Sequence, residues 1–212
     1  MSDYRVLSVD DVGDDTVSVE IESPADLSDS ASPGQFVEIS AEIDGEEVSR
    51  YYTISSPYVT ETFETTVEVD PEGDLSPYLS TPEDSVSVSV EGPYGSSYYE
   101  GEKDVVVLAG GPGVGPAVGI AERAVDDGGS ATVIYYDDDP VHRDRLNAVD
   151  TSERGEVIYV ETDTDFTDSV SDAVESGSQV FVYGFEEFVE KARDALEDAG
   201  YDIEEAKIES FG

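Results

Sequence analysis

The feature that most constrains this chain lies near its middle, where a strand, a glycine-rich turn and a helix follow one another directly. Residues 105–109 form a continuous apolar run, which is typical of a strand buried on both faces of a parallel sheet. The turn 110–116 follows at once, and 116–125 has the pattern of a helix. Strands that alternate with helices predict a doubly wound parallel α/β domain. The further strands are predicted at 131–136, 157–160 and 180–183, and the further helices near 166–175 and 185–199.

The first hundred residues follow a different pattern, in which apolar and polar residues alternate. A period of two is typical of strands with one buried face. Such strands are predicted at 4–12, 16–21, 35–43, 51–55, 62–69 and 85–91, with one short helix at 75–80. Many short strands predict a small closed barrel. The polar stretch 96–103 separates the two patterns, so we predict domains at 1–99 and 100–212.

The charge of the chain is extreme, because 52 acidic residues oppose 10 basic ones and give a formal net charge of -42. Such repulsion favours disorder in a chain with little apolar sequence, but apolar alternation runs through most of this chain. We therefore interpret the acidity as adaptation to very high intracellular salt, which screens charges within about 3 Å at 1 M. Without a basic patch, the chain is not expected to bind nucleic acid or an anionic membrane.

Cysteine is absent, and His142 is the single histidine. This excludes disulfides, thiolate catalysis, zinc–thiolate sites and iron–sulfur clusters ligated by this chain, and no metal site is expected. No apolar run approaches the roughly 20 residues that span a bilayer, and the acidic, alternating N-terminus does not resemble a signal peptide. We expect a cytoplasmic protein without membrane insertion.

The glycine-rich turn comprises Gly110, Gly111, Pro112, Gly113, Val114, Gly115 and Pro116. A doubly wound sheet binds a dinucleotide at such a turn, because glycines let the backbone approach the pyrophosphate and the helix N-terminus offers free N–H groups. Pro116 suits the first turn of that helix. The spacing differs from G-x-G-x-x-G, so a tight turn without a ligand is the alternative. The position of the turn in the first strand–helix unit favours binding.

Arg50 is unusual because Arg5 and Arg50 are the two basic residues of the first hundred. It either neutralises nearby carboxylates or holds a pyrophosphate with its forked guanidinium. Tyr52 lies two residues further along the predicted strand, and therefore on the same face, where its ring can stack on a flat ligand. Thr53 adds a hydroxyl that can bond to a ring nitrogen.

Five motifs resemble those of the ferredoxin–NADP reductase superfamily and occur in the family's order. They are P-G-Q-[FY]-[VL] at 33–37, R-x-Y-[ST] at 50–53, G-x-x-[ST] at 73–76, G-P-[FY]-G at 92–95 and G-G-x-G-x-x-P at 110–116. Together they are a strong signal, although each alone is weak. The resemblance covers almost the whole chain. It implies a six-stranded antiparallel Greek-key β-barrel that binds FAD, followed by an α/β domain that binds NADH or NADPH.

The resemblance also implies roles for single residues. Arg50 would contact the FAD pyrophosphate, Tyr52 would stack on the isoalloxazine and Thr53 would bond near its N5. The other residues implied to bind FAD are Ile54, Ser55, Gly73, Leu75 and Ser76. Beyond the glycine-rich turn, the residues implied to bind the nicotinamide dinucleotide or close its site are Tyr183, Gly184, Phe185 and Phe211. The catalytic residues would be Tyr52, Thr53 and Tyr183.

Two residues depart from the family pattern. Pro112 replaces a threonine that is often found in the nicotinamide loop, which we interpret as variation. Tyr183 stands where the family commonly has a cysteine near the nicotinamide C4. It either forms a wall of the site, obstructs stacking, or is a core tyrosine at the end of a strand.

The last four residues, 209–212, resemble the E-x-F-G that precedes a [2Fe–2S] domain in some relatives. No such domain follows in this sequence. Electrons are therefore expected to leave to a separate acceptor, such as a ferredoxin-like protein, or to free flavin or quinone.

The acidic triplet Asp137-Asp138-Asp139 follows the second buried strand, where NADPH users of the family have a serine and an arginine. Carboxylates accept hydrogen bonds from ribose hydroxyls and repel a 2′-phosphate, so NADH is favoured. Arg143 and Arg145 follow on a helix, where they are expected to pair with Asp139 and Asp144.

The predicted function is hydride transfer between NAD(P)H and FAD, with delivery of electrons to a separate acceptor. One alternative is a flavin reductase that releases reduced flavin. The other is a non-catalytic flavin-binding relay subunit, in which Tyr183 blocks the nicotinamide.

Overall fold

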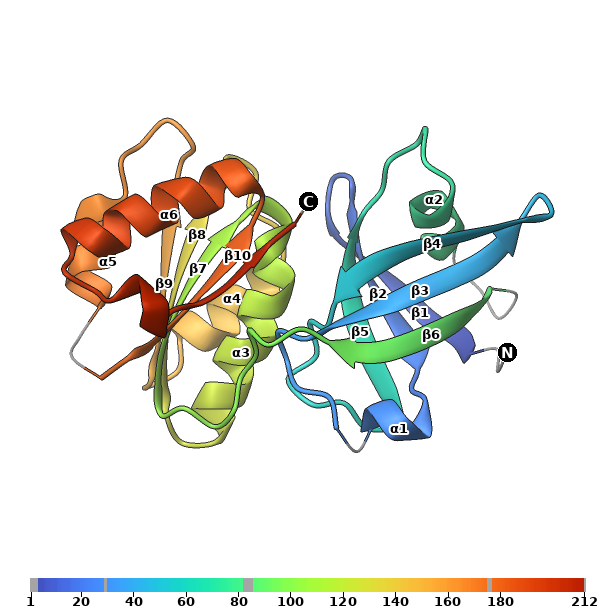
Figure 1. Cartoon of the computed structure of the whole chain (residues 1–212), viewed down its shortest axis with the longest axis horizontal. Helices are drawn as coiled ribbons and strands as arrows, with labels where there is room; N and C mark the ends of the chain where they lie inside the picture. The colour runs from blue at the N-terminus through green and yellow to red at the C-terminus, as the bar shows by residue number, and fades with distance from the viewer. Residues whose placement is uncertain (1–3, 29, 82–85, 175–176, 212) are drawn as a thin grey trace.

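The computed structural model describes residues 4–28, 30–81, 86–174 and 177–211. Two domains lie side by side, a β-barrel from the first half of the chain and an α/β domain from the second (Figure 1). Two ends of predicted elements, Ser85 and Glu175, lie outside the described residues.

The barrel is a six-stranded antiparallel sheet with the strand order β4-β3-β6-β1-β2-β5. A bridge between Ile54 and Thr65 joins the chain just beyond β4 to β5, so the two edge strands meet. This architecture confirms the predicted antiparallel barrel. Its described elements are β1 (Tyr4–Gly13), β2 (Thr16–Glu22), α1 (Ala25–Ser28), β3 (Phe36–Ile43), β4 (Glu46–Thr53), β5 (Thr62–Glu68), α2 (Leu75–Leu79) and β6 (Ser87–Tyr94).

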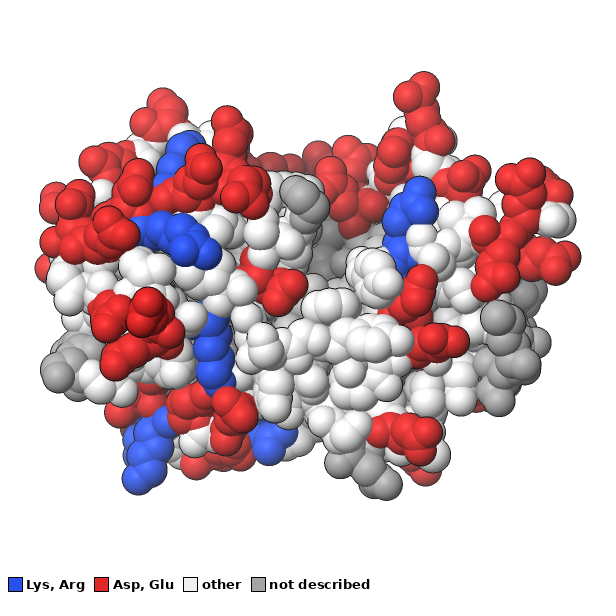
Figure 2. Space-filling view, viewed as in Figure 1, with Lys and Arg blue, Asp and Glu red and all other residues white. Residues whose placement is uncertain are grey.

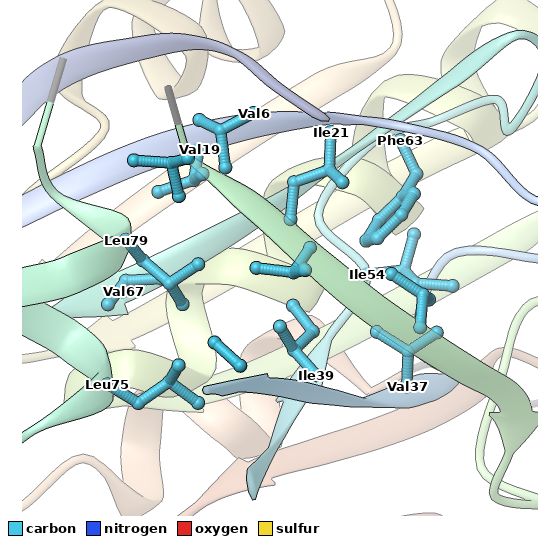
Figure 3. Close-up of a cluster of buried hydrophobic side chains, with 14 of the residues drawn as sticks. Val6, Val19, Ile21, Val37, Ile39, Ile54, Phe63, Val67, Leu75 and Leu79 are labelled. Atoms are coloured by element: carbon cyan, nitrogen blue, oxygen red, sulfur yellow. The ribbon is translucent and has the colours of Figure 1, made fainter. Parts of the chain in front are cut away.

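Alternation along the strands builds the barrel core. On β5, for example, Phe63, Thr65 and Val67 are buried while the residues between them face outward. Their apolar partners on the other strands point toward one another in the barrel interior, and Leu75 and Leu79 of α2 close one end (Figure 3). Each fully buried aliphatic or aromatic side chain of this kind contributes about 1.5–3 kcal/mol to folding.

The strand predicted at 51–55 is wrong in its bounds, because β4 runs from Glu46 to Thr53. It begins directly after the Asp44-Gly45 turn and pairs with β3 over its whole length. Its first two residues are exposed glutamates and Val48 is the one apolar residue of its first half, as an edge strand allows, so apolar alternation does not reveal it.

The second domain is a parallel five-stranded sheet with the order β11-β10-β7-β8-β9. Buried side chains fill both of its faces, with α3 and α4 on one and α5 and α6 on the other. The predicted doubly wound α/β domain is thus confirmed. Its described elements are β7 (Asp104–Gly110), η1 (Gly111–Gly113), α3 (Val114–Asp126), β8 (Ser130–Tyr136), α4 (Arg143–Asp150), β9 (Gly155–Val160), α5 (Thr167–Ala173), β10 (Gln179–Gly184), α6 (Glu186–Asp198), η2 (Ile203–Glu205) and β11 (Lys207–Ser210).

The strand order places a switch point between β7 and β10. The chain proceeds from β7 to β8 on one side, and later returns to place β10 on the other. In open α/β sheets, ligands bind in the crevice outside the carboxyl ends of strands at such a point. Residues that follow β7 and β10, among them Pro112 and Phe185, line a cavity together with residues of the barrel.

Arg145 connects the two domains. Arg145 of α4 forms a two-bond ion pair with Glu122 of α3, at 2.6 and 2.8 Å, and also contacts Glu64 of β5. Its Nη2 donates to the carbonyl of Ser55 at 2.8 Å. The prediction that Arg145 pairs with Asp139 or Asp144 is wrong, because its side chain points across the interface toward the barrel.

The surface is strongly acidic. Figure 2 shows Asp and Glu over much of the visible rim of both domains, while the middle of this face is largely uncharged. Among the described helices, none is long and apolar enough to cross a membrane.

Candidate active site

A cavity of about 710 Å³ lies between the domains. This volume is within the range of roughly 300–1,000 Å³ that is typical of small-molecule and cofactor sites. The barrel contributes Phe36, Tyr51, Tyr52, Thr53, Thr66, Glu68 and Tyr94. The α/β domain contributes Pro112, Gly115, Pro116, Phe185, Glu209, Ser210 and Phe211.

The end of β4 forms the centre of the barrel wall. Tyr52 lies opposite the buried Val37 of β3 and packs partly against the barrel core, while Thr53 lies opposite Phe36. Burial raises the pKa of Tyr52 to about 12, although the charge of Arg50 opposes this rise. The Tyr52 hydroxyl therefore stays protonated at neutral pH, and the residue offers a neutral ring to a ligand.

Arg50 lies beside the cavity and is not among the residues that line it. In the register of β3 and β4, Arg50 is paired with Ile39 and Tyr52 with Val37. The side chains of Arg50 and Tyr52 therefore share a face of β4, as predicted. The guanidinium is exposed, and Nη1 donates to the carbonyl of Ser49 at 2.7 Å. This position suits a charged group of a ligand whose ring lies against Tyr52.

Aromatic side chains form the rest of the barrel wall. Phe36, Tyr51 and Tyr94 make a cluster with ring centroids 5.6 to 6.3 Å apart. No role was predicted for these three residues, although Phe36 and Tyr94 belong to two of the family-like motifs. The signal was therefore in the sequence, but only the assembled barrel shows that these strands meet here.

On the α/β side, the cavity lies at the switch point. Pro112, Gly115 and Pro116 reach it from the turn after β7, and Phe185 from the turn after β10. Phe211 packs edge-on against Phe185, with ring centroids 6.4 Å apart, and its backbone N–H donates to the carbonyl of Gly184 at 2.9 Å. The glycine-rich turn thus borders the cavity, as expected for a dinucleotide-binding turn.

Packing inside the protein explains two of the glycines. A Cβ on Gly113 would lie 2.0 Å from the carbonyl oxygen of Tyr183, and one on Gly110 would lie 2.3 Å from the Phe188 ring. Gly111 is different, because its φ of +53° is left-handed and the nearest atom, Asp137 Oδ2, would be 3.9 Å from a Cβ. At Gly111 there is therefore open space in which a ligand could come close to the protein backbone.

Tyr183 is a core residue at the end of β10, which agrees with one of its three predicted roles and corrects the other two, in the wall of the cavity or obstructing it. Its side chain is fully buried and stacks on Phe181, and its hydroxyl donates to the carbonyl of Ser97. Alternation along β10 turns Tyr183 toward the inside of the domain, so its ring neither forms a wall of the cavity nor obstructs it. Phe185, two residues further, is 53% exposed and lines the cavity instead.

Ile54 and Ser55 are also buried away from the cavity. The backbone N–H of Ile54 donates to Gln35, and that of Ser55 donates to Glu64. The Ser55 hydroxyl donates to the Glu64 carboxylate at 3.0 Å, and its carbonyl accepts from Arg145. These groups hold the barrel closed and join it to the α/β domain, which corrects the expectation that they bind the cofactor.

The G-x-x-[ST] segment lies at the start of α2, which packs on β3 and β4. Leu75 is buried in the barrel core, and Ser76 Oγ accepts from the Asp70 N–H at 3.1 Å. Gly73 N–H donates to the Asp70 carbonyl at 3.0 Å. The segment does not line the cavity, and the helix that it opens packs on β4, the strand that carries Arg50. A pyrophosphate site beside Arg50 therefore stays a prediction.

The acidic triplet has two different environments. Asp138 accepts from the backbone and hydroxyl of Thr162, and these bonds lower its pKa. Asp137 lies beside Gly111 at the end of β8. Asp137 is therefore the carboxylate of the triplet that borders the glycine-rich turn.

A carboxylate also lies inside the cavity. Glu209, on β11 beside the switch point, is partly buried, and this burial raises its pKa. The strand that carries Glu209 was not predicted, because β11 has only four residues and, among the described strands, pairs with β10 alone. Its parallel pairing with β10 brings 209–211 to the cavity.

His142 is buried where the two domains meet, with 3% of its surface exposed. Its backbone is left-handed (φ +54°), its N–H donates to Val12 of β1 at 3.1 Å, and its Nε2 is 2.8 Å from Thr66 Oγ1. Burial, and then the charge of Arg145, lower the pKa of His142 from 6.5 to about 4. The imidazole is therefore neutral at neutral pH.

This burial predicts a pH dependence of stability. The unfolded chain binds a proton near pH 6.5 and the folded protein only near pH 4, so the contribution of neutral His142 is fully present above pH 6.5 and is lost as the pH falls to 4. The loss is up to about 3 kcal/mol. We expect the unfolding free energy of wild type, relative to His142→Asn, to fall across this window at constant high salt. Asparagine tolerates the left-handed backbone, and parallel pH curves for the two proteins would contradict the prediction.

Comparison with known proteins agrees with this architecture. Residues 3–99 match the family described as the oxidoreductase FAD-binding domain. The fold is similar to the flavohem-like FAD/NAD-binding domain of nitric oxide dioxygenase from Vibrio cholerae (TM-score 0.82, 18% identity, 100% of this chain and 99% of that one). It is also similar to ferredoxin-NADP+ reductase from Plasmodium falciparum (TM-score 0.79, 13% identity, 99% and 96%).

Curated relatives match part of the chain. A glycine betaine monooxygenase reductase subunit from Chromohalobacter salexigens is 40% identical over 99 residues, which are 44% of this chain and 27% of that protein. An NADH-cytochrome b5 reductase-like protein from Mus musculus is 28% identical over 134 residues, 62% and 42% of the two chains. The matches thus span less than half of these relatives' lengths.

Residues 3–99 thus match the oxidoreductase FAD-binding domain family, and the fold of the whole chain is similar to the two-domain folds of these two solved structures. The cavity fits FAD in its chemistry, since aromatic rings suit a flat isoalloxazine and threonine hydroxyls suit its polar edge, and the guanidinium of Arg50 on the same face of β4 as Tyr52 would suit the pyrophosphate.

Proposed function

We propose that the protein is an NAD(P)H-dependent flavoprotein oxidoreductase, with NADH as its preferred co-substrate. The supporting observation is that one cavity is lined both by Tyr52 and Thr53 of the FAD-binding domain and by Phe185 and the glycine-rich turn at the switch point. Bound FAD would supply the hydride chemistry, accepting two electrons from the nicotinamide and releasing them to an acceptor. We place the domain boundary between residues 99 and 100.

The residues of the chain would bind and orient the two cofactors. Arg50 would hold the pyrophosphate, Tyr52 would stack on the ring system, and Thr53 would donate a hydrogen bond near N5. Pro112 and Phe185 would border the nicotinamide, and the backbone at Gly111 would approach the dinucleotide phosphates. The aromatic and proline walls would keep water away from the reacting rings.

The electron acceptor is proposed to be a separate protein, such as a ferredoxin. The names of the curated relatives, a monooxygenase reductase subunit and a cytochrome b5 reductase-like protein, support a partner of this kind. The relay alternative depended on obstruction by Tyr183, and the buried position of that ring removes this support. At a net charge of -42, pairing with another acidic protein requires high salt to screen repulsion.

Discrimination between NADH and NADPH is expected to depend on Asp137. The carboxylate beside Gly111 would accept hydrogen bonds from the ribose and repel a 2′-phosphate, a repulsion of about 1 kcal/mol or more at 4 Å. Asp137→Ser is expected to raise kcat/KM for NADPH, relative to NADH, by roughly tenfold. Asp139→Ser, two residues on and exposed, is the control and should change the ratio by less than about twofold. Equal ratios in wild type and Asp137→Ser would show that this carboxylate does not select the cofactor.

The proposed function is tested by anaerobic titration of FAD-loaded protein with NADH at high salt. Bound FAD should lose its visible absorption band at about one NADH per flavin. An unchanged spectrum with both dinucleotides would overturn the proposal.

A further inference from the structure

A hydroxyl on the barrel wall of the cavity is in contact with a residue of the other domain. Thr66 lies on β5 and lines the cavity, and its Oγ1 is 2.8 Å from Nε2 of His142, the residue before α4. α3 also approaches this hydroxyl closely, because a Cβ on Gly115 would lie 2.9 Å from the same oxygen. Thr66 thus lies where the barrel, the α/β domain and the cavity meet.

The hydrogen between Thr66 and His142 can be assigned. Nδ1 of His142 is buried and has no hydrogen-bond partner among the residues that the structure describes. Because the ring is neutral at neutral pH, it carries a single hydrogen. A buried N–H without an acceptor is disfavoured more than a buried lone pair without a donor. The hydrogen is therefore on Nε2, and His142 donates to Thr66 Oγ1.

This assignment fixes the role of the Thr66 hydroxyl. Its oxygen accepts from His142, so its own hydrogen is available for an acceptor elsewhere. Within the described ranges, no carbonyl or carboxylate accepts this hydrogen, and the open side of Thr66 is the cavity. Of the two outward carboxylates that flank Thr66 on β5, Glu64 is occupied by Arg145 and Ser55, and the exposed Glu68 does not accept from Thr66 among the described residues. Thr66 therefore presents a hydrogen-bond donor to whatever occupies the cavity.

We propose that Thr66 donates this hydrogen bond to the isoalloxazine of FAD, and that His142 is the positioning residue that orients it. The proposal rests on the proposed function, since it requires FAD in the cavity. The flavin is the acceptor because Thr66 belongs to the FAD-binding domain and lies beside Thr53, to whose carbonyl the adjacent Thr65 donates at 2.9 Å. The carbonyl oxygens and N1 of the isoalloxazine become more electron-rich on reduction, so a fixed donor to one of these acceptors stabilises the reduced ring more.

The test is the midpoint potential of bound FAD, measured with a chemical reductant and a reference dye, which needs no reaction with a nicotinamide. In Thr66→Val, we expect reduced FAD to bind about tenfold more weakly relative to oxidised FAD, which is a potential about 30 mV lower. Thr66→Ser keeps the hydroxyl and should stay within about twofold of wild type. Thr66→Ala repeats the measurement if the valine variant does not fold.

A double-mutant cycle tests the role of His142. His142→Asn should lower the potential in the same direction as Thr66→Val, and adding it to Thr66→Val should cause no further change, because His142 acts through Thr66. Unchanged potentials in Thr66→Val and Thr66→Ala would overturn the proposal, and so would a full additional shift from His142→Asn in the Thr66→Val protein. Failure of the proposed function is recognised separately, since wild type would then not bind FAD or would not be reduced by NADH.

Discussion

Replacing Arg50 by alanine is expected to weaken FAD binding by about 10- to 100-fold, which corresponds to loss of a charge-assisted hydrogen bond worth about 1.5–3 kcal/mol. Arg50 shares a face of β4 with Tyr52, and its guanidinium is exposed beside the cavity. A forked cation suits two pyrophosphate oxygens at once. Arg50→Lys keeps the charge without the fork and should give an intermediate loss. Binding is measured by fluorescence titration of apoprotein with FAD at fixed high salt.

Arg5→Ala is the matched control. Arg5 is the other arginine of the barrel, and its Nε bonds to Glu22 at 3.0 Å on a different part of the surface. Exposed ion pairs of this kind contribute little to stability, and FAD affinity should stay within about twofold of wild type. If Arg50→Ala binds FAD as tightly as Arg5→Ala does, Arg50 does not hold the pyrophosphate.

Replacing Arg145 by glutamine is expected to lower the unfolding free energy by about 3 kcal/mol and to slow flavin reduction by NADH, with FAD affinity nearly unchanged. The substitution leaves the carboxylates of Glu64 and Glu122 close together without their cation. Breaking a largely buried ion pair in this way leaves a charge uncompensated and is strongly destabilising. The same substitution removes the bond to the Ser55 carbonyl, so the position of the α/β domain relative to the barrel is less fixed.

Arg143→Gln is the control, because Arg143 lies two residues earlier on the same helix, is exposed and lies over the Tyr159 ring at 5.8 Å. Its unfolding free energy should change by less than about 0.5 kcal/mol. Adding Glu64→Gln to Arg145→Gln should recover part of the lost stability, since it removes one of the repelling charges. Denaturant unfolding at constant salt gives all four values. Equal losses in the Arg143 and Arg145 variants would contradict the account of the interface.

Local sequence patterns predicted the strands that have at least one face buried in a core. The apolar run at 105–109 is buried on both faces as expected, and alternation marks β2 and β5 because one face of each is in the core. The first half of β4 and all of β11 were missed. One is a mostly polar stretch of an edge strand with a single apolar residue and the other is four residues long, so neither leaves an apolar pattern in the sequence.

The site was predicted where a motif residue points into the cavity, and missed where tertiary packing decides the direction of a side chain. Tyr52 and Thr53 line the cavity, but Ser55 in the same segment is buried in the domain interface. Tyr183 and Phe185 are two residues apart, and strand alternation alone would place them on the same face. Only the structure shows that β10 ends at Gly184 and that Phe185, in the turn before α6, reaches the cavity. Thr66 and His142 are far apart in the chain, and no local pattern could indicate that they meet.

The central claim is that NADH reduces FAD bound between these two domains, and the most direct measurement is anaerobic rapid mixing of FAD-loaded protein with NADH at high salt. The account predicts loss of the visible flavin band in a single turnover, and a slower rate when the transferred hydrogen at the nicotinamide C4 is deuterium. A flavin band that persists with NADH and with NADPH, but disappears with a chemical reductant, would contradict it.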